Sequence, residues 1–271
     1  MKIAILGAGM SGLVAAQSLF DLGIYDIDIY DKCVENVSQQ KGLHYLHGNC
    51  GLSLEPRRIE NLVLKPDSME VEDYVQYSIK VWGEPNVLNN SVRDLPKSTL
   101  VYDFKQGYDI LIKRFGRYIQ KMDITRDFIR TCQLEYDCII STIPMQVIFP
   151  DAVCESETMY VSQGLPIGLE FQDCTVAYNL HMDVPWYRAS KVFGQCYTEY
   201  VNNQPDAVPI KKIKTQTSII TDEVFIKNKI LLVGRFAEWN RKRLVHEVYS
   251  IVKGGMTILK VFGKTNTSLI D

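Results

Sequence analysis

Three glycines near the start of the chain have the spacing of a turn that binds phosphate. Gly7, Gly9 and Gly12 form a G-x-G-x-x-G pattern directly after a short apolar run. In such a turn the first glycine permits a sharp reversal, the second lets the backbone approach a pyrophosphate, and the third lets the helix pack closely on its strand. The helix N-terminus adds free N–H groups and the positive end of its dipole. The pattern favours nucleotide binding over an ordinary glycine-rich turn.

An acidic residue follows where the ribose of a bound nucleotide would lie. Asp31 ends the alternating run DIDIYD, which follows the apolar stretch VAAQSLF. Strand, glycine turn, helix, second strand and terminal acid therefore fall in the order of a βαβ nucleotide-binding unit. We expect Asp31 to accept hydrogen bonds from a ribose diol, with Lys32 beside it at the same site.

Two histidines lie in an irregular, glycine-rich loop over residues 41–52. His44 and His47 are three residues apart, but no carboxylate lies at a customary metal-ligand spacing, and the thiol of Cys50 belongs to no known pattern. We therefore favour histidines that face a cofactor or substrate over histidines that bind a metal. For either one singly, a plain hydrogen bond to a loop carbonyl explains the residue equally well.

An aromatic pair beside a cation is the next group that could bind a ligand. Trp186, Tyr187 and Arg188 lie in VPWYRAS, between two runs that are expected to be strands. Two flat amphipathic surfaces next to a guanidinium suit a ring, a phosphate or a carboxylate. An aromatic turn that clamps the edge of the sheet is an equally good interpretation.

A second phosphate-type turn is expected near the end of the chain. Residues 229–233 (KILLV) predict a buried strand, and Gly234 and Arg235 follow at once. There Arg235 would neutralise a pyrophosphate. Helical periodicity over 240–252 is followed by Gly254 and Gly255, which we interpret as C-caps. The cations of 211–214 and 241–243 are interpreted as solvated basic faces.

The elements between these groups complete the expected architecture. We predict mostly helix over 55–82, strands over 99–104 and 136–144, a helix over 108–119, and an antiparallel sheet within 158–200. The last of these segments differs in character from the parallel sheet that the opening unit requires.

Composition places the chain among ordinary globular proteins. Its 271 residues are 46% hydrophobic and 23% charged, with a formal net charge of -2, which gives no overall attraction to nucleic acid or anionic membrane. No window is long enough to span a membrane, and we expect a cytoplasmic protein with no membrane partner. The odd number of cysteines without C-x-x-C spacing argues against a disulfide framework or a zinc site; they are Cys33, Cys50, Cys132, Cys138, Cys154, Cys174 and Cys196.

Several of these pieces resemble one superfamily of flavoproteins. GAGMSGLVAA with IDIYDK resembles the FAD fingerprint of glutathione-reductase-type proteins, and YDCIISTIP is similar to the strand by which they return from the substrate domain. LLVGRFAEWNRKRLVHEVYSIV and GLHYLHGN resemble the C-terminal flavin contact and the histidine loop of UDP-galactopyranose mutases and related amine-oxidase-like enzymes. Together the pieces cover roughly half the chain.

The resemblance implies an α/β fold. It would consist of a Rossmann-type FAD-binding domain with a parallel sheet (1–60, 101–150 and 222–271), a helix and loop insert (61–100), and a smaller inserted antiparallel-sheet substrate domain (151–221). FAD is the implied cofactor, without a separate NAD(P)H domain, because only one G-x-G-x-x-G occurs. The cofactor-binding residues that it implies are Gly7, Gly9, Ser11, Gly12, Asp31, Lys32, His44, Gly234 and Arg235.

The resemblance also implies a reaction. We expect an amine-oxidase-like FAD-dependent oxidoreductase that acts on the C–N bond of an amine or an amino-acid adduct, with His44, Tyr187 and Arg188 at the catalytic site. The compact size also resembles bacteriophage flavoenzymes that process an amino acid attached to thymine in DNA, which makes DNA a candidate substrate. The alternatives are a redox-neutral mutase-like enzyme acting on a nucleotide sugar and a catalytically silent FAD-binding module.

Overall fold

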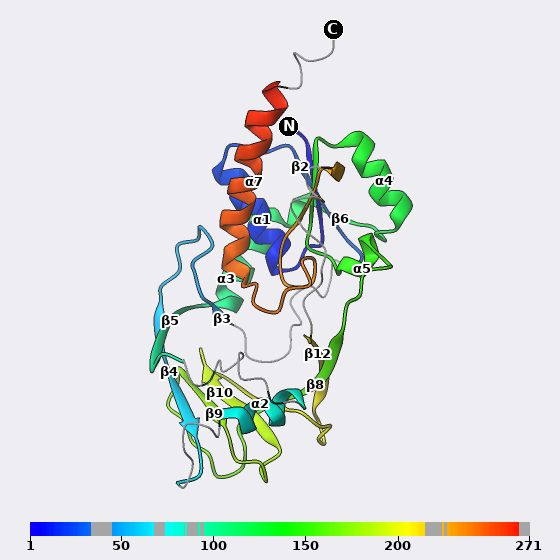
Figure 1. Cartoon of the computed structure of the whole chain (residues 1–271). Coiled ribbons are helices and arrows are strands. Elements are labelled where there is room, and N and C mark those ends of the chain that lie inside the picture. Colours follow the sequence, from blue (N-terminus) through cyan, green and yellow to red (C-terminus); the bar gives the residue numbers. More distant parts are fainter. Residues whose placement is uncertain are drawn as a thin grey trace.

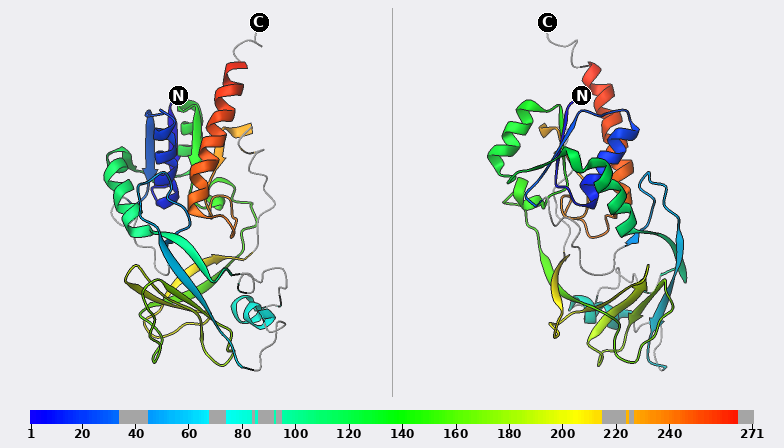
Figure 2. Two further views of the ribbon diagram at one scale, coloured as in Figure 1. Left: turned by 90° about the vertical axis from the view of Figure 1, so that its left-hand side faces the viewer. Right: turned by 180° about the vertical axis from the view of Figure 1, so that it is seen from behind.

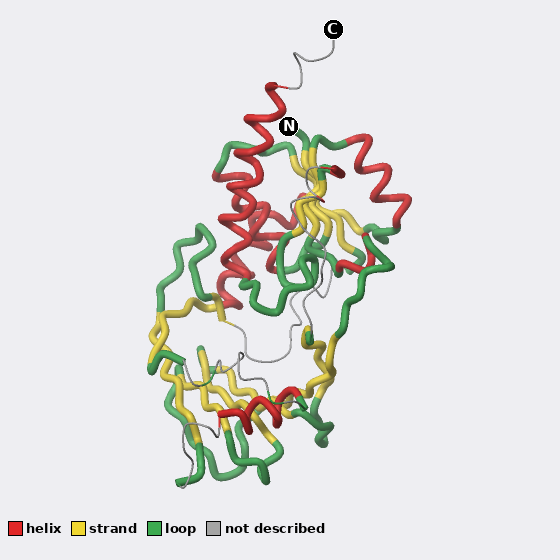
Figure 3. The backbone as a smooth tube through the Cα atoms, in the orientation of Figure 1, coloured by secondary structure: helices red, strands yellow, loops and turns green. Residues whose placement is uncertain are grey.

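A computed structural model describes residues 1–33, 45–67, 74–83, 85, 92, 95–214, 224 and 227–265 of the chain. These residues form two units, each built on its own sheet, and the chain passes several times between them (Figure 1). Figure 3 shows the strands of the two sheets as separate groups. No helix in the described part of the chain is long and apolar enough to cross a membrane.

The first unit is a five-stranded parallel sheet. Its strands are ordered β13-β7-β1-β2-β6, and every neighbouring pair is parallel. Strands β1, β7 and β13 are short, mainly apolar runs buried on both faces, as is typical of a parallel sheet, whereas the edge strand β6 is only partly buried. The expected α/β class with a parallel sheet is confirmed. The strands are β1 (Ile3–Leu6), β2 (Ile27–Asp31), β6 (Ile119–Lys121), β7 (Cys138–Ser141) and β13 (Ile230–Leu232).

Helices cover both faces of this sheet (Figures 1 and 2). One core packs Ile3 and Ile5 against one group of helices, and the other packs Ala4 and Leu6 against the second group, because alternate residues of β1 face opposite sides. The first group is α1 (Met10–Asp21), α3 (Phe104–Phe115) and α7 (Val245–Thr265), and the second is α4 (Arg126–Glu135) and α5 (Met145–Ile148). A single 3-10 turn, Gly116–Tyr118, follows α3.

The second unit is an eight-stranded sheet in the order β12-β8-β11-β10-β9-β4-β5-β3. All neighbours are antiparallel except β4 and β9, which are parallel. Helix α2 (Tyr74–Trp82) covers one face, where Lys80 Nζ donates to the carbonyl oxygens of Asn179 (3.2 Å) and His181 (2.6 Å). The strands are β3 (Tyr45–Leu46), β4 (Arg57–Leu64), β5 (Ser98–Asp103), β8 (Ser156–Gln163), β9 (Thr175–Asn179), β10 (Trp186–Val192), β11 (Gln195–Tyr200) and β12 (Val208–Ile213).

Two local predictions were wrong. Residues 57–64, predicted as mostly helix, form strand β4, because pairing with both β5 and β9 overrides a mixed apolar pattern. Residues 186–188 are not in a turn between strands; they begin strand β10. The aromatic residues that suggested a turn are instead the buried side chains of a strand in the middle of the sheet.

The C-terminal helix also differs from its prediction. Helix α7 begins at Val245 and continues through Gly254 and Gly255, which are therefore not C-caps. Val248, Val252 and Met256 are fully buried against the α1 side of the parallel sheet, and Ser18 Oγ of α1 donates to the carbonyl oxygen of Tyr249 (2.8 Å). This packing stabilises the helix despite two glycines, since tertiary contacts outweigh their low helix propensity.

We expect Gly254→Ala to stabilise the protein by about 0.5–1 kcal/mol, because alanine loses less backbone entropy than glycine in a helix interior. Gly254 is exposed, and an added Cβ would meet no atom within 4 Å. Chemical denaturation followed by circular dichroism measures the change. A loss of stability would mean that Gly254 adopts the left-handed conformation of a C-cap.

Candidate functional site

The glycine turn after β1 combines tight packing with one open position. Gly7 has a φ of +100°, and a Cβ on Gly12 would overlap the carbonyl oxygen of Gly7, so the strand and α1 lie in direct backbone contact. A Cβ on Gly9 would meet no atom within 4 Å. Gly9 is also the N-cap of α1 and offers no side-chain hydrogen bond. The first turn of α1 therefore leaves its N–H groups available beside open space, as phosphate binding requires.

Asp31 fixes the shape of this turn. One carboxylate oxygen accepts the N–H of Ala8 (2.7 Å), and the other accepts the N–H of Cys33 (2.9 Å). The carboxylate thus joins the end of β2 to the glycine turn. Each oxygen retains a second lone pair, so a ribose contact stays a prediction. Lys32, next to it, is exposed.

Gly234, which follows strand β13 near the C-terminal end of the chain, packs against the same glycine turn. Gly234 has a φ of +93°, and a Cβ added there would lie 2.9 Å from Ser11 Oγ. Ser11 is in the first turn of α1. The structure therefore brings together Gly9, Ser11 and Gly234, three of the residues that the sequence predicted to bind a dinucleotide.

The segment after Gly234 is held by a buried carboxylate. Glu238 is 6% exposed; it accepts the N–H of Gly234 (3.0 Å) and the Nε–H of Arg243 (2.8 Å). Arg243 is therefore not part of a solvated basic face on a helix, as 241–243 was interpreted, and α7 begins only after it. Arg235 is exposed, and its Nε lies 3.5 Å from the carbonyl oxygen of Arg243. This arrangement holds the Arg235 guanidinium at the carboxyl edge of the parallel sheet.

These residues fit a dinucleotide with two phosphates and an aromatic ring system. The open position at Gly9 and the uncapped end of α1 suit a pyrophosphate. Two buried polar atoms in the segment that follows Gly234, Trp239 Nε1 and His246 Nδ1, have no hydrogen-bond partner in the described part of the chain. Such atoms are rare in proteins and indicate a missing partner.

The histidine loop is described only in part. His44 lies outside the described residues, so its predicted place at the flavin stays a prediction. His47 is exposed, with its ring 4.9 Å from that of Tyr45 and 6.2 Å from that of His246 on α7. Among the described residues, no group of three or more His, Cys, Asp and Glu side chains is placed to hold a metal ion.

A buried ion pair defines the predicted WYR site. The register shifts between Trp186 and Arg188, and this β-bulge turns Tyr187 and Arg188 toward the same carboxylate. Glu199 is 3% exposed; it accepts the Tyr187 hydroxyl (2.5 Å) and the Arg188 Nε–H (2.8 Å), and Arg188 Nη2 also bonds to it. Burial alone would raise the pKa of Glu199, but the Arg188 guanidinium lowers it below its usual value.

This pairing changes the role of the aromatic residues. Tyr187 is 2% exposed and Trp186 is 7% exposed, so neither ring presents to a ligand the flat surface that the sequence suggested. Tyr187 instead lies beneath Arg188 and positions it through Glu199. The Arg188 side chain keeps 30% of its surface exposed. Of the three residues, only the cation is open to a ligand.

Arg188 lies close enough to the nucleotide side to interact with it electrostatically. Partial desolvation of the Arg235 guanidinium, and next the charge of Arg188, lower the pKa of Arg235 although part of its side chain is exposed. Tyr45, on the strand at the far edge of the sheet, has its pKa raised to about 12, mainly by burial and by Tyr178. Arg188 on β10 and Arg235 after the end of β13 are thus within electrostatic range of each other. We call Arg188, Lys212 and Arg235 the junction cations.

Lys212 is the third member, and it was interpreted as part of a solvated face. Its Nζ instead lies 4.2 Å from the ring centre of Trp82 and 4.9 Å from that of Tyr187. Arg241 also lies over Trp82, at 5.3 Å. Trp82 of α2 therefore contacts a cation from its own unit and one from the other. Burial, and next the charge of Arg188, lower the pKa of Lys212 to about 7.

Sequence reasoning missed Glu199, Lys212 and Trp82. A signal existed for Glu199. In the strand Gln195–Tyr200 it lies on the same face as Tyr197, and an acid that is buried beside an aromatic residue needs a cation. No comparable signal existed for the other two, because their contact joins a helix to a strand far along the sequence.

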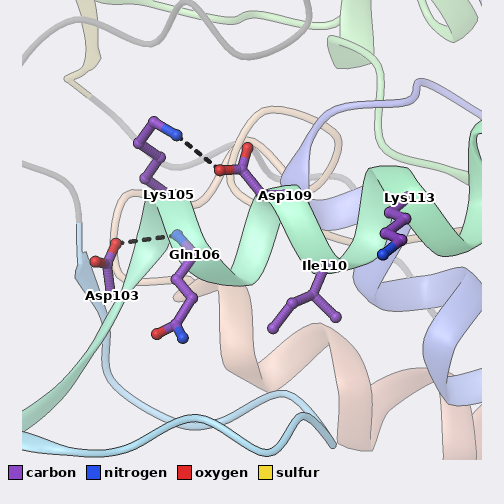
Figure 4. A pocket seen from close by; sticks show the side chains of 6 residues that line it. All are labelled: Asp103, Lys105, Gln106, Asp109, Ile110 and Lys113. Atoms are coloured by element: carbon purple, nitrogen blue, oxygen red, sulfur yellow. Dashed lines mark hydrogen bonds and ion pairs between the residues drawn. The ribbon is translucent and has the colours of Figure 1, made fainter.

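A shallow hollow on α3 does not belong to this site (Figure 4). Its polar groups satisfy one another: Lys105 pairs with Asp109 (2.7 Å), and Asp103 accepts the N–H of Gln106 (3.1 Å) as a helix N-cap. Such local pairs are typical of a solvated helix surface.

Comparisons with known proteins identify the fold. A scan of protein-family models and a search of curated proteins find no match. Among solved structures, a reduced UDP-galactopyranose mutase aligns over 96% of this chain and 94% of its own, with 13% identity and a TM-score of 0.58. A 2,6-dihydroxypyridine-3-hydroxylase from Arthrobacter nicotinovorans aligns over 97% of this chain and 84% of its own, with 13% identity and a TM-score of 0.54. BrvH, a flavin-dependent halogenase from Brevundimonas sp. BAL3, aligns over 96% of this chain and 71% of its own, with 9% identity and a TM-score of 0.50. The chain has the fold of this group of flavoproteins.

The glycine turn offers a matched pair of substitutions. We expect Gly9→Ala to keep the wild-type melting temperature but to weaken FAD binding at least tenfold, because its methyl group occupies the space of the pyrophosphate. Gly12→Ala forces β1 and α1 apart, and we expect it to lower stability by about 2 kcal/mol or more. Thermal melting and flavin-fluorescence titration measure both. Equal effects of the two variants on FAD affinity, with melting temperatures unchanged, would contradict this assignment.

Proposed function

We propose that the protein is a FAD-dependent oxidoreductase that acts on the C–N bond of an amine bearing an anionic group. The observation that carries the proposal is that the guanidinium groups of Arg188 and Arg235 are within electrostatic range of each other. Arg188 lies on β10 in the second sheet, and Arg235 follows β13 in the parallel-sheet unit, beside the glycine turn.

The chain offers residues for each part of the cofactor. The first turn of α1, with Gly9 and Ser11, would bind the pyrophosphate, and Asp31 would bind the adenosine ribose. Gly234 and Arg235 would lie beside the pyrophosphate and the flavin, with Lys32 at the adenosine end and His44 near the isoalloxazine. FAD, when bound, supplies a hydride acceptor, and the protein supplies placement and electrostatics.

The junction cations would hold and prepare the substrate. A carboxylate or phosphate of the substrate would accept hydrogen bonds from the exposed part of Arg188, whose orientation Glu199 and Tyr187 fix. The same positive charges lower the pKa of a nearby substrate amine, since a like charge disfavours its protonated form. A neutral amine has the lone pair that must form the C=N bond as the hydride leaves the carbon. The cations therefore favour the reactive form.

Anaerobic mixing tests the proposed reaction. We expect the absorbance of oxidised flavin to fall when the FAD-loaded protein meets its substrate among amino acids and amino-acid adducts, free or attached to thymine in DNA. Amines that carry no carboxylate or phosphate group are the controls and should leave the flavin oxidised. A flavin that no amine or amino-acid adduct bleaches would contradict the proposal and favour a catalytically silent FAD-binding module.

Arg235 provides a second test. Replacing Arg235 with Gln removes one charged hydrogen-bond donor, and we expect KM for the anionic substrate to rise about tenfold to a hundredfold. The exposed Lys242, in the same segment, is the matched control, and Lys242→Gln should change KM less than about twofold. Steady-state kinetics at fixed ionic strength measure both. An equal effect of the two substitutions would reduce Arg235 to a general contribution of surface charge.

One observation favours a second candidate, a redox-neutral mutase-like enzyme acting on a nucleotide sugar. Three cations at one junction suit a diphosphate as well as a carboxylate. Such an enzyme would need its flavin reduced beforehand. Reduced protein that converts UDP-galactopyranose to an isomer would establish this function, and unchanged UDP-galactopyranose would remove it.

A further inference from the structure

Lys212 is held in the junction by aromatic rings rather than by a carboxylate. Its ammonium lies over Trp82 at 4.2 Å and over Tyr187 at 4.9 Å. Among the described residues, no Asp or Glu oxygen lies within ion-pair distance of it. Aromatic faces attract a cation, but much more weakly than a buried carboxylate does.

The two acids that face Lys212 are already paired. Glu199, on β11, is bound by Arg188 and Tyr187. Glu157 lies directly opposite Lys212 on β8, but its carboxylate forms an ion pair with Lys214 at 3.3 Å. Both still attract the ammonium of Lys212 from a distance. Neither is free to give it a direct partner.

The other charges near Lys212 are positive. Arg188 on β10 and Arg235 after β13 both disfavour its protonation, and Arg241 shares Trp82 with it. Among the charged groups that the structure describes around Lys212, the cations therefore outnumber the carboxylates that are placed to balance them. A ligand with two negative charges would complete this balance.

We propose that Lys212 is the proton-accepting member of an anion site, and that it takes up a proton when the anionic group of the substrate binds between Arg188 and Arg235. The inference rests on the proposed function and adds the substrate class, a molecule with a dianionic group. It assigns Lys212 a role in binding, separate from the hydride transfer itself.

The direction of the coupling follows from charge. An anion favours the ammonium form, so binding raises the pKa of Lys212 from its free value of about 7. Affinity is then highest below pH 7, where Lys212 is already protonated. It falls as the pH rises from 7 to the pKa of the complex, because each binding event in that window must take a proton from water.

Competitive acetylation of the FAD-loaded protein tests the inference, with inorganic sulfate as the probe because it stays dianionic over the whole range. We expect the midpoint of Lys212 acetylation, read by mass spectrometry, to rise by at least about one pH unit when sulfate replaces chloride at equal ionic strength. The exposed neighbour Lys211 is the internal reference, and its acetylation should not change with sulfate.

Three variants complete the test. At about pH 8, sulfate should cause proton uptake by the wild type and by Lys211→Met, but not by Lys212→Met. Arg188→Gln should raise the midpoint of Lys212 without sulfate, because it removes a cation and frees Glu199. The melting temperature and the flavin spectrum report whether each variant is folded.

A midpoint that sulfate leaves unchanged in the folded, FAD-loaded protein would overturn the inference. So would a midpoint that FAD alone raises fully, since the cofactor phosphates would then occupy the site. Failure of the proposed function is distinguishable, because it appears as a flavin that no amine reduces while sulfate still shifts Lys212.

Discussion

The close contact of backbone with backbone at the carboxyl edge of the parallel sheet is the constraint on which the structure depends. The carbonyl of Gly7 leaves no room for a side chain at Gly12, and Ser11 leaves little at Gly234. These contacts bring the first and last strands of the chain against one helix end. The candidate nucleotide site depends on two distant glycines, Gly12 and Gly234, which let the chain ends pack without side chains between them.

A buried carboxylate organises the second unit in a comparable way. Glu199 would be costly to bury alone, and it is stabilised by the Arg188 guanidinium and the Tyr187 hydroxyl. The same bonds fix the direction of Arg188 at the junction. Glu238 does the equivalent on the nucleotide side, where it joins Gly234 to Arg243. Each unit thus uses one buried acid to hold an arginine-bearing segment.

The two units differ in what holds their elements together. Strands β1, β7 and β13 of the parallel sheet are buried between helices, and their continuous, mainly apolar runs specify them locally. Strands of the second sheet pair with partners far away in the chain, and β4 joins β9 although more than a hundred residues separate their sequence positions. Such strands are defined by their partners and by the face that they bury, and their own sequences are mixed in character.

The sequence by itself determined the opening βαβ unit, because glycine spacing, apolar strands and the acid at the end of β2 are all local patterns. It also indicated the return of the chain at β13 and Gly234. Only the tertiary structure decided that 57–64 is a strand, that α7 passes through Gly254, and that Tyr187 is buried. It alone brought Lys212 to Trp82 and Arg188 to Glu199. The physical reason is that burial and ion pairing depend on which distant segments meet, and no local spacing contains that information.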